Sequence, residues 1–94
     1  MTILGKFIKQ PADVLDYDFD YRDWATDRND TIESATATSS SPDLVVLDYL
    51  IFDNVVKVFV EGGIDETRYK LTCTAYTQNS RVKQAEISIF VKET

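Results

Sequence analysis

The chain has 94 residues, of which 44% are hydrophobic and 28% charged, which fits one small soluble domain. No apolar run approaches the roughly 18 residues that span a bilayer, so we expect no membrane segment. There is no histidine and only one cysteine, Cys73, so the commonest general base is absent and no intramolecular disulfide can form. We therefore expect a non-enzymatic protein without metal or cofactor, made in a reducing cytoplasm.

The acidic charge is concentrated in one part of the chain. The net charge is −6, and residues 11–33 alone account for it, with eight acidic residues against Arg22 and Arg28. An acidic surface repels nucleic acid and anionic membranes, so we expect neither as a partner. It favours a basic protein partner instead.

The first ten residues differ from the rest of the chain. They mix lysines with isolated apolar residues, and Pro11 separates them from the first clear strand; the apolar residues are Ile3, Leu4, Phe7 and Ile8. We predict an extended N-terminal arm over residues 1–10 that is ordered by contact with a neighbouring subunit. The alternative is that Ile3 to Ile8 form an edge strand of the same domain.

Period-two alternation begins at Leu15. Apolar Leu15, Tyr17 and Phe19 alternate with Asp16, Asp18 and Asp20, which predicts a strand with one buried face and one acidic face. The three aspartates resemble the start of a calcium loop. However, the sixth position holds Tyr21 where the loop needs glycine, and the twelfth holds Asp27 where it needs glutamate. A solvated acidic face is the better interpretation, and a loop is expected at about 25–30.

Further short strands follow, separated by turn residues every 8–12 positions. The segment 44–52 is a dense apolar run that forms one strand or two short ones broken near Asp48, and Asp53-Asn54 is a good two-residue turn. The other expected strands cover about 31–38, 56–61, 69–76 and 85–91. About six to seven short strands with this spacing predict an all-β sandwich over residues 11–94.

Aromatic residues out of step with the core are the best interaction signal. Phe59, Tyr76 and Phe90 alternate with residues assigned to the core, so they should point outward. We expect them to gather in one contact patch with the acidic strand as its rim. The alternatives are that the N-terminal arm covers them or that a strand changes face at a bulge.

Two further residues have both a structural and a functional interpretation. Trp24 is expected to cover the edge of the core, and the alternative is an interface anchor. Cys73 lies on the predicted inner face beside Leu71 and Ala75, where a thiol acts as a small hydrophobe.

Several segments in this order resemble the small immunoglobulin-like phage virion proteins that act as fibre–tail adaptors. They are DVLDYDFDYRDW (13–24), DTIESA (30–35), VFVEGG (58–63), YKLTCT (69–74), Arg81 and EISIFV (86–91). The resemblance covers about residues 11–92, and the opening Asp-Tyr block with Trp24 is its most distinctive part. Residues 1–10 lie outside it, and the usual glycine before Arg81 is replaced by Ser80.

The resemblance implies an immunoglobulin-like sandwich and a structural role in the virion tail. A protein of this kind would attach tail fibres to the tail or connector as multiple symmetric copies of itself. Its partners would be other tail or connector proteins and the tail fibre. The alternative function is an immunoglobulin-like decoration or recognition module that binds a cell-surface protein or carbohydrate.

Overall fold

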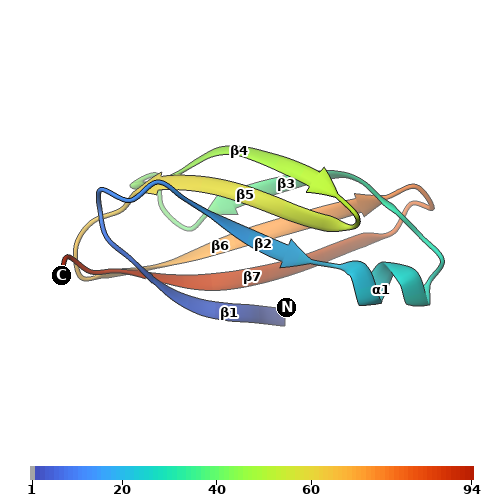
Figure 1. Ribbon diagram of the computed structural model, residues 1–94, viewed down its shortest axis with the longest axis horizontal. Coiled ribbons are helices and arrows are strands. Elements are labelled where there is room, and N and C mark those ends of the chain that lie inside the picture. The colour runs from blue at the N-terminus through green and yellow to red at the C-terminus, as the bar shows by residue number, and fades with distance from the viewer. Residues whose placement is uncertain (1) are drawn as a thin grey trace.

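The protein is a two-layer β-sandwich with one short helix (Figure 1). The computed structural model describes the backbone of residues 2–94 and the side chains of residues 5–94. One sheet has the strand order β1-β7-β6-β3 and the other β2-β5-β4. The elements are β1 (Thr2–Lys9), β2 (Leu15–Asp20), α1 (Arg22–Asp27), β3 (Ile32–Ser39), β4 (Leu44–Phe52), β5 (Val55–Gly62), β6 (Thr67–Thr77) and β7 (Val82–Val91).

The core follows directly from the period-two pattern. On β5, Val58 and Val60 are fully buried while Phe59 between them is half-buried and points to the outer face. On β7, Ile89 is fully buried and Phe90 is half-buried. Burying these apolar faces against each other holds the two sheets together. The predicted all-β sandwich is therefore confirmed.

Six of the seven strands are divided between the sheets as in immunoglobulin sandwiches, with β2, β5 and β4 in one sheet and β3, β6 and β7 in the other. Strand β1 departs from the constant-type arrangement, because it lies beside β7 and not in the sheet of β2. Near the start of β6, the Tyr69 hydroxyl accepts a hydrogen bond from the Ile64 N–H at 2.8 Å, the geometry of a tyrosine corner. Across the core, the Tyr21 hydroxyl donates to the Cys73 carbonyl at 2.9 Å.

Strand β1 is an edge strand of the same domain, which is the alternative that the sequence left open. It pairs in parallel with β7, and the Lys92 N–H donates to the Lys9 carbonyl at 2.8 Å. Lys9 is 1% exposed, and its ammonium donates to the Gly62 carbonyl at 2.7 Å. This bond joins β1 to the end of β5 in the opposite sheet. The side chains of Ile3 and Leu4 lie outside those that the structure describes.

The connections differ from prediction at one place. Helix α1 occupies part of the expected loop at 25–30, and its single buried residue is Ala25. A six-residue helix with one buried side chain has no detectable 3.6-residue period.

Asp53 and Asn54 both have positive φ, 49° and 59°, as a two-residue hairpin turn requires. Strand β4 is continuous, with a bulge between Val46 and Asp48.

Among the described residues, no helix is long and apolar enough to cross a membrane.

Candidate interaction surfaces

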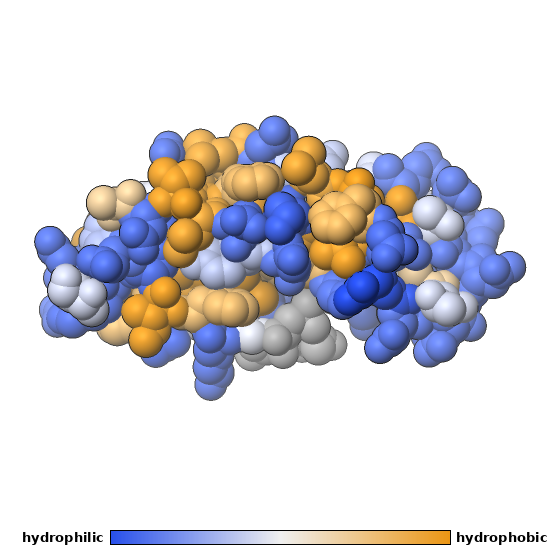
Figure 2. All heavy atoms as spheres, viewed as in Figure 1, coloured by the Kyte–Doolittle hydropathy of each residue, from blue (hydrophilic) through white to orange (hydrophobic). Residues whose placement is uncertain are grey.

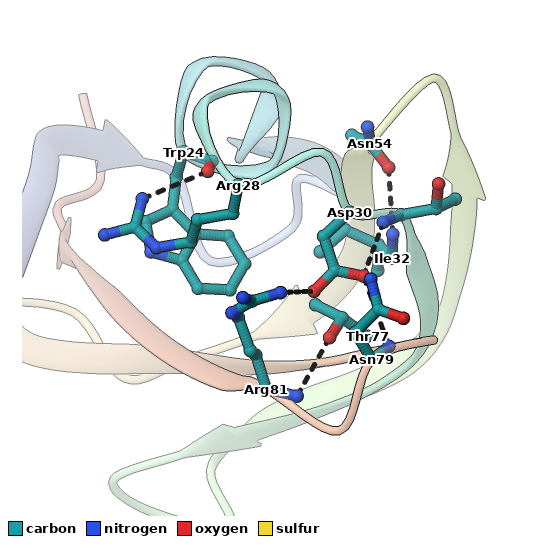
Figure 3. A network of polar contacts seen from close by, with 9 residues as sticks. Trp24, Arg28, Asp30, Ile32, Asn54, Thr77, Asn79 and Arg81 are labelled. Carbon is teal, nitrogen blue, oxygen red and sulfur yellow. Dashed lines mark hydrogen bonds and ion pairs between the residues drawn. The ribbon is translucent and has the colours of Figure 1, made fainter.

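A buried carboxylate organises the end of the sandwich that carries α1 (Figure 3). The side chain of Asp30 is 0% exposed and lies 2.9 Å from the Arg81 guanidinium. It also accepts hydrogen bonds from the backbone N–H groups of Thr31, at 2.9 Å, and Asn79, at 3.2 Å. Burial alone would raise its pKa, but hydrogen bonds from Thr77, Arg81 and these N–H groups outweigh burial and lower the pKa to about 2. Asp30 is therefore a structural anion.

Trp24 covers the core beside this network. It is half-buried and packs against the core cluster. The Arg28 guanidinium lies 5.1 Å from the centre of its ring and also donates to the Trp24 carbonyl at 3.2 Å. Figure 3 shows this pair next to Arg81. The packing supports the core-edge interpretation of Trp24, and an interface role remains a prediction.

The outer face of β2-β5-β4 carries three aspartates of β2, which we call the acidic row: Asp16, Asp18 and Asp20. Neighbouring side chains on this face include Asp16 beside Phe59, and Asp18 beside Lys57. The Lys57 ammonium lies 2.8 Å from Asp16 and 3.0 Å from Asp18. Its hydrogen bond lowers the pKa of Asp16. Within the described part of the chain, no group of three acidic, cysteine or histidine residues is placed to hold a metal ion.

Strand β4 exposes a strip of large apolar side chains along the edge of this sheet. Figure 2 shows hydrophobic residues along the upper edge of the molecule, where Figure 1 draws β4. We define the β4 strip as Val45, Leu47, Leu50 and Phe52, which are 42%, 47%, 53% and 54% exposed. A long apolar edge strand with unpaired backbone groups is a ready surface for protein contact.

Sequence reasoning missed the β4 strip. The dense apolar run over 44–52 predicts strand structure but does not indicate which of its side chains are exposed. Position at a sheet edge depends on the strand order, which a single sequence does not reveal. The strand has a bulge between Val46 and Asp48, and bulges are frequent at sheet edges. Asp48 is the one residue in the sequence that indicates this irregularity.

The outer face of β1-β7-β6 is basic. Two rows of neighbouring side chains cross it, Ile8–Phe90–Arg68 and Lys6–Ser88–Lys70. The Arg68 guanidinium stacks 5.2 Å from the centre of the Phe90 ring and donates to the Ser88 hydroxyl at 3.2 Å. Lys6, Arg68 and Lys70 line a shallow hollow together with Glu86, Ile87 and Ser88. We call Lys6, Arg68 and Lys70, with Phe90 and Ile8, the basic face.

The predicted single aromatic patch is wrong. Phe59 lies on β5 of one sheet, whereas Tyr76 and Phe90 lie on strands of the other. Phe90 lies opposite Arg68 on β6, and Tyr76 is eight residues further along that strand, about 26 Å away. Topology, which alternation does not determine, separates the three rings.

The N-terminal residues are divided between two places. Ile8 lies beside Phe90 on the outer face and is 71% exposed. Phe7 points the other way, and its ring centre lies 4.9 Å from that of Tyr17. Of the predicted contact residues, the structure therefore brings together Ile8 and Phe90.

Comparison with known proteins identifies one related family. A family model described as "Podophage GP4 fiber-tail adaptor protein gp77" matches residues 9–90. A search of curated proteins found no match. The match includes Asp30 and Arg81, helix α1, the β4 strip and most of the basic face.

Proposed function

Because the chain belongs to the podophage GP4 fiber-tail adaptor family, we propose that it is a non-enzymatic structural protein of the virion tail. It joins the tail fibre to the tail or connector and is present as multiple symmetric copies. It is made in the host cytoplasm and neither nucleic acid nor membrane is among its partners. The observation that carries the proposal is the β4 strip.

The β4 strip has the properties of a protein-docking surface. Four large apolar side chains, each about half exposed, follow one another on a single edge strand. Fully burying a side chain of this kind is worth about 1.5–3 kcal/mol, so a partner that covers all of the exposed area of the four, each about half exposed, gains about 3–6 kcal/mol. The unpaired edge of β4 can add backbone hydrogen bonds to a strand of the partner. We assign this surface to the tail fibre.

Phe59 and the acidic row border this surface on the side of β2. Phe59 lies between Asp16 on β2 and Asp48 on β4. Asp48 lies on β4 itself, and a carboxylate at the rim of an apolar contact selects a partner with a basic group at the matching position.

The alternative role as a recognition module for carbohydrate or a cell surface has less support. Aromatic side chains on exposed loops would favour it. In the described chain, the exposed aromatics lie on strands, at Phe7, Tyr49, Phe52 and Tyr76.

The test uses particles that lack this protein and are complemented with purified variants. Leu50→Lys combined with Phe52→Lys places charges in the β4 strip and should abolish fibre attachment, seen as fibreless tails by electron microscopy. Val82→Lys is the matched control, because Val82 is also an exposed apolar residue but lies on β7. Normal fibre attachment by the folded double variant would contradict the assignment.

A further inference from the structure

The basic face stands out in an acidic protein. Although the net charge is −6, three of the ten basic residues converge on two neighbouring rows of one sheet. The ion pairs of the described chain involve Arg22, Lys57, Arg81 and Lys92, but none of Lys6, Arg68 and Lys70. Glu86 lies in the same hollow without forming an ion pair. The face therefore offers positive charge to a partner.

The opposite face of the same molecule offers the complementary pattern. Arg68 and Lys70 are two residues apart on β6, as Asp16 and Asp18 are on β2. Side chains at this spacing lie about 7 Å apart on one face of a strand, so both charged pairs have the same repeat. Each pair also flanks a half-buried aromatic ring, Phe90 beside Arg68 and Phe59 beside Asp16.

We propose that the basic face docks the β2 side of the acidic face of a second copy of this chain. Arg68 and Lys70 of one copy meet Asp16 and Asp18 of the next, with Phe90 and Phe59 at the centre of the contact. Lys57 already pairs with both carboxylates within its own copy, so Asp16, Asp18 and Lys57 together offer a net charge of −1 to the basic face. The inference rests on the multi-copy role proposed above. Arg68 is well suited to the contact, because stacking on Phe90 holds the guanidinium in place before binding.

The contact joins two different faces, so each copy has one surface of each kind to offer. Such heterologous contacts build rings when the rotation between copies closes. Strands β2 and β4 are opposite edges of their sheet, so the outer edge of β4 stays accessible to the fibre. Nucleic acid is a poorer occupant of the basic face, because the whole chain carries −6.

Ionic strength separates the local attraction from the overall repulsion. At about 0.15 M salt the Debye length is roughly 8 Å, so long-range repulsion between two acidic copies is screened while side chains in contact still attract. At about 1 M salt the Debye length falls to roughly 3 Å. Association of the purified chain should therefore be seen at the lower salt and weaken at the higher.

The experiment is sedimentation velocity on the full chain and two charge-reversed variants. The first carries Arg68→Glu and Lys70→Glu, and the second carries Asp16→Lys and Asp18→Lys. Each should be folded by circular dichroism and monomeric alone, because like charges then face each other. Mixing the two restores opposite charges at every contact, so association should return. Asp23→Lys with Asp27→Lys on α1 raises the net charge as much as the Asp16 and Asp18 changes do and should leave self-association intact.

Two results would overturn the proposal. One is a wild-type chain that stays monomeric at about 1 mM, a concentration at which any contact with a dissociation constant well below about 1 mM would be largely formed. The other is a mixture of folded variants that stays monomeric. Loss of fibre attachment in the β4 variant is measured separately. Sedimentation can thus disprove the contact between copies while fibre attachment still supports the adaptor role. The opposite outcome can be recognised in the same way.

Discussion

The Asp30 carboxylate lies 2.9 Å from the guanidinium of Arg81, which is 51 residues further along the chain. The pair joins the segment between α1 and β3 to the turn between β6 and β7. Both residues belong to segments that carry the resemblance to the adaptor family. In this protein the pair holds the end of the sandwich that carries α1, and Trp24 and Arg28 lie beside it.

The Asp30 network predicts a specific dependence of stability on pH. The pKa of Asp30 is about 2 in the folded protein, against an ordinary value of 3.8. The unfolded chain therefore takes up a proton first as pH falls, and the stabilisation, complete above about pH 4, is lost as the pH approaches 2. Asp30→Asn should be less stable at neutral pH, and its deficit relative to wild type should shrink across this window. Urea unfolding at several pH values measures it; a constant deficit would contradict the role of the charge.

Neighbouring residues on β7 should differ sharply in their effect on stability. Ile89 is fully buried, so Ile89→Ala should lower the free energy of unfolding by about 2–5 kcal/mol. Phe90 is half-buried on the outer face, so Phe90→Ala should cost about 1 kcal/mol. Denaturant titration of both variants measures the difference. Equal costs, or a larger cost for Phe90, would mean that the two faces of β7 are assigned wrongly.

Strand β1 should contribute to the stability of the isolated domain. Lys9→Met keeps the aliphatic stem but leaves the Gly62 carbonyl without its donor, which should cost about 1–3 kcal/mol. Lys6→Met is the matched control on the same strand, because Lys6 is exposed, and should change stability by less than about 0.5 kcal/mol. Removal of residues 1–9 should be more damaging still, because it strips the β7 edge. A deletion variant with wild-type stability would show that β1 acts only between subunits.

The tyrosine corner predicts a further asymmetry. Tyr69→Phe removes the acceptor of the Ile64 N–H and should cost about 1 kcal/mol. Tyr49→Phe is the control, since Tyr49 is partly exposed on the edge strand β4. Thermal unfolding of the two variants compares them. The corner would have no energetic role if both melted like wild type.

Local alternation predicted the strands and the core because each buried position has its own sequence signal. Val58 and Ile89 are apolar between more exposed neighbours, and both are fully buried. The turn at Asp53-Asn54 was also predictable, since these residue types tolerate positive φ. What alternation cannot supply is the partner of each strand.

The functional surfaces depend on that missing information. The basic face requires that Lys6, at the start of the chain, lie across Ser88 from Lys70. The β4 strip requires that residues 44–52 have a neighbour on one side only. Both are consequences of strand order. For the same reason, alternation predicted the outward direction of Phe59 and Phe90 but placed them in one patch.

The parallel pairing of β1 with β7 sets the order in which the four-stranded sheet can form. Strand β1 is synthesised long before the strand that it pairs with, so the sheet cannot close until β7 has been made. Lys6 and Lys70 are likewise held on one surface only after β7 lies between them. A nascent chain therefore has no completed basic face to offer to another copy. The proposed contact between copies therefore requires a folded β7 in the copy that supplies the basic face.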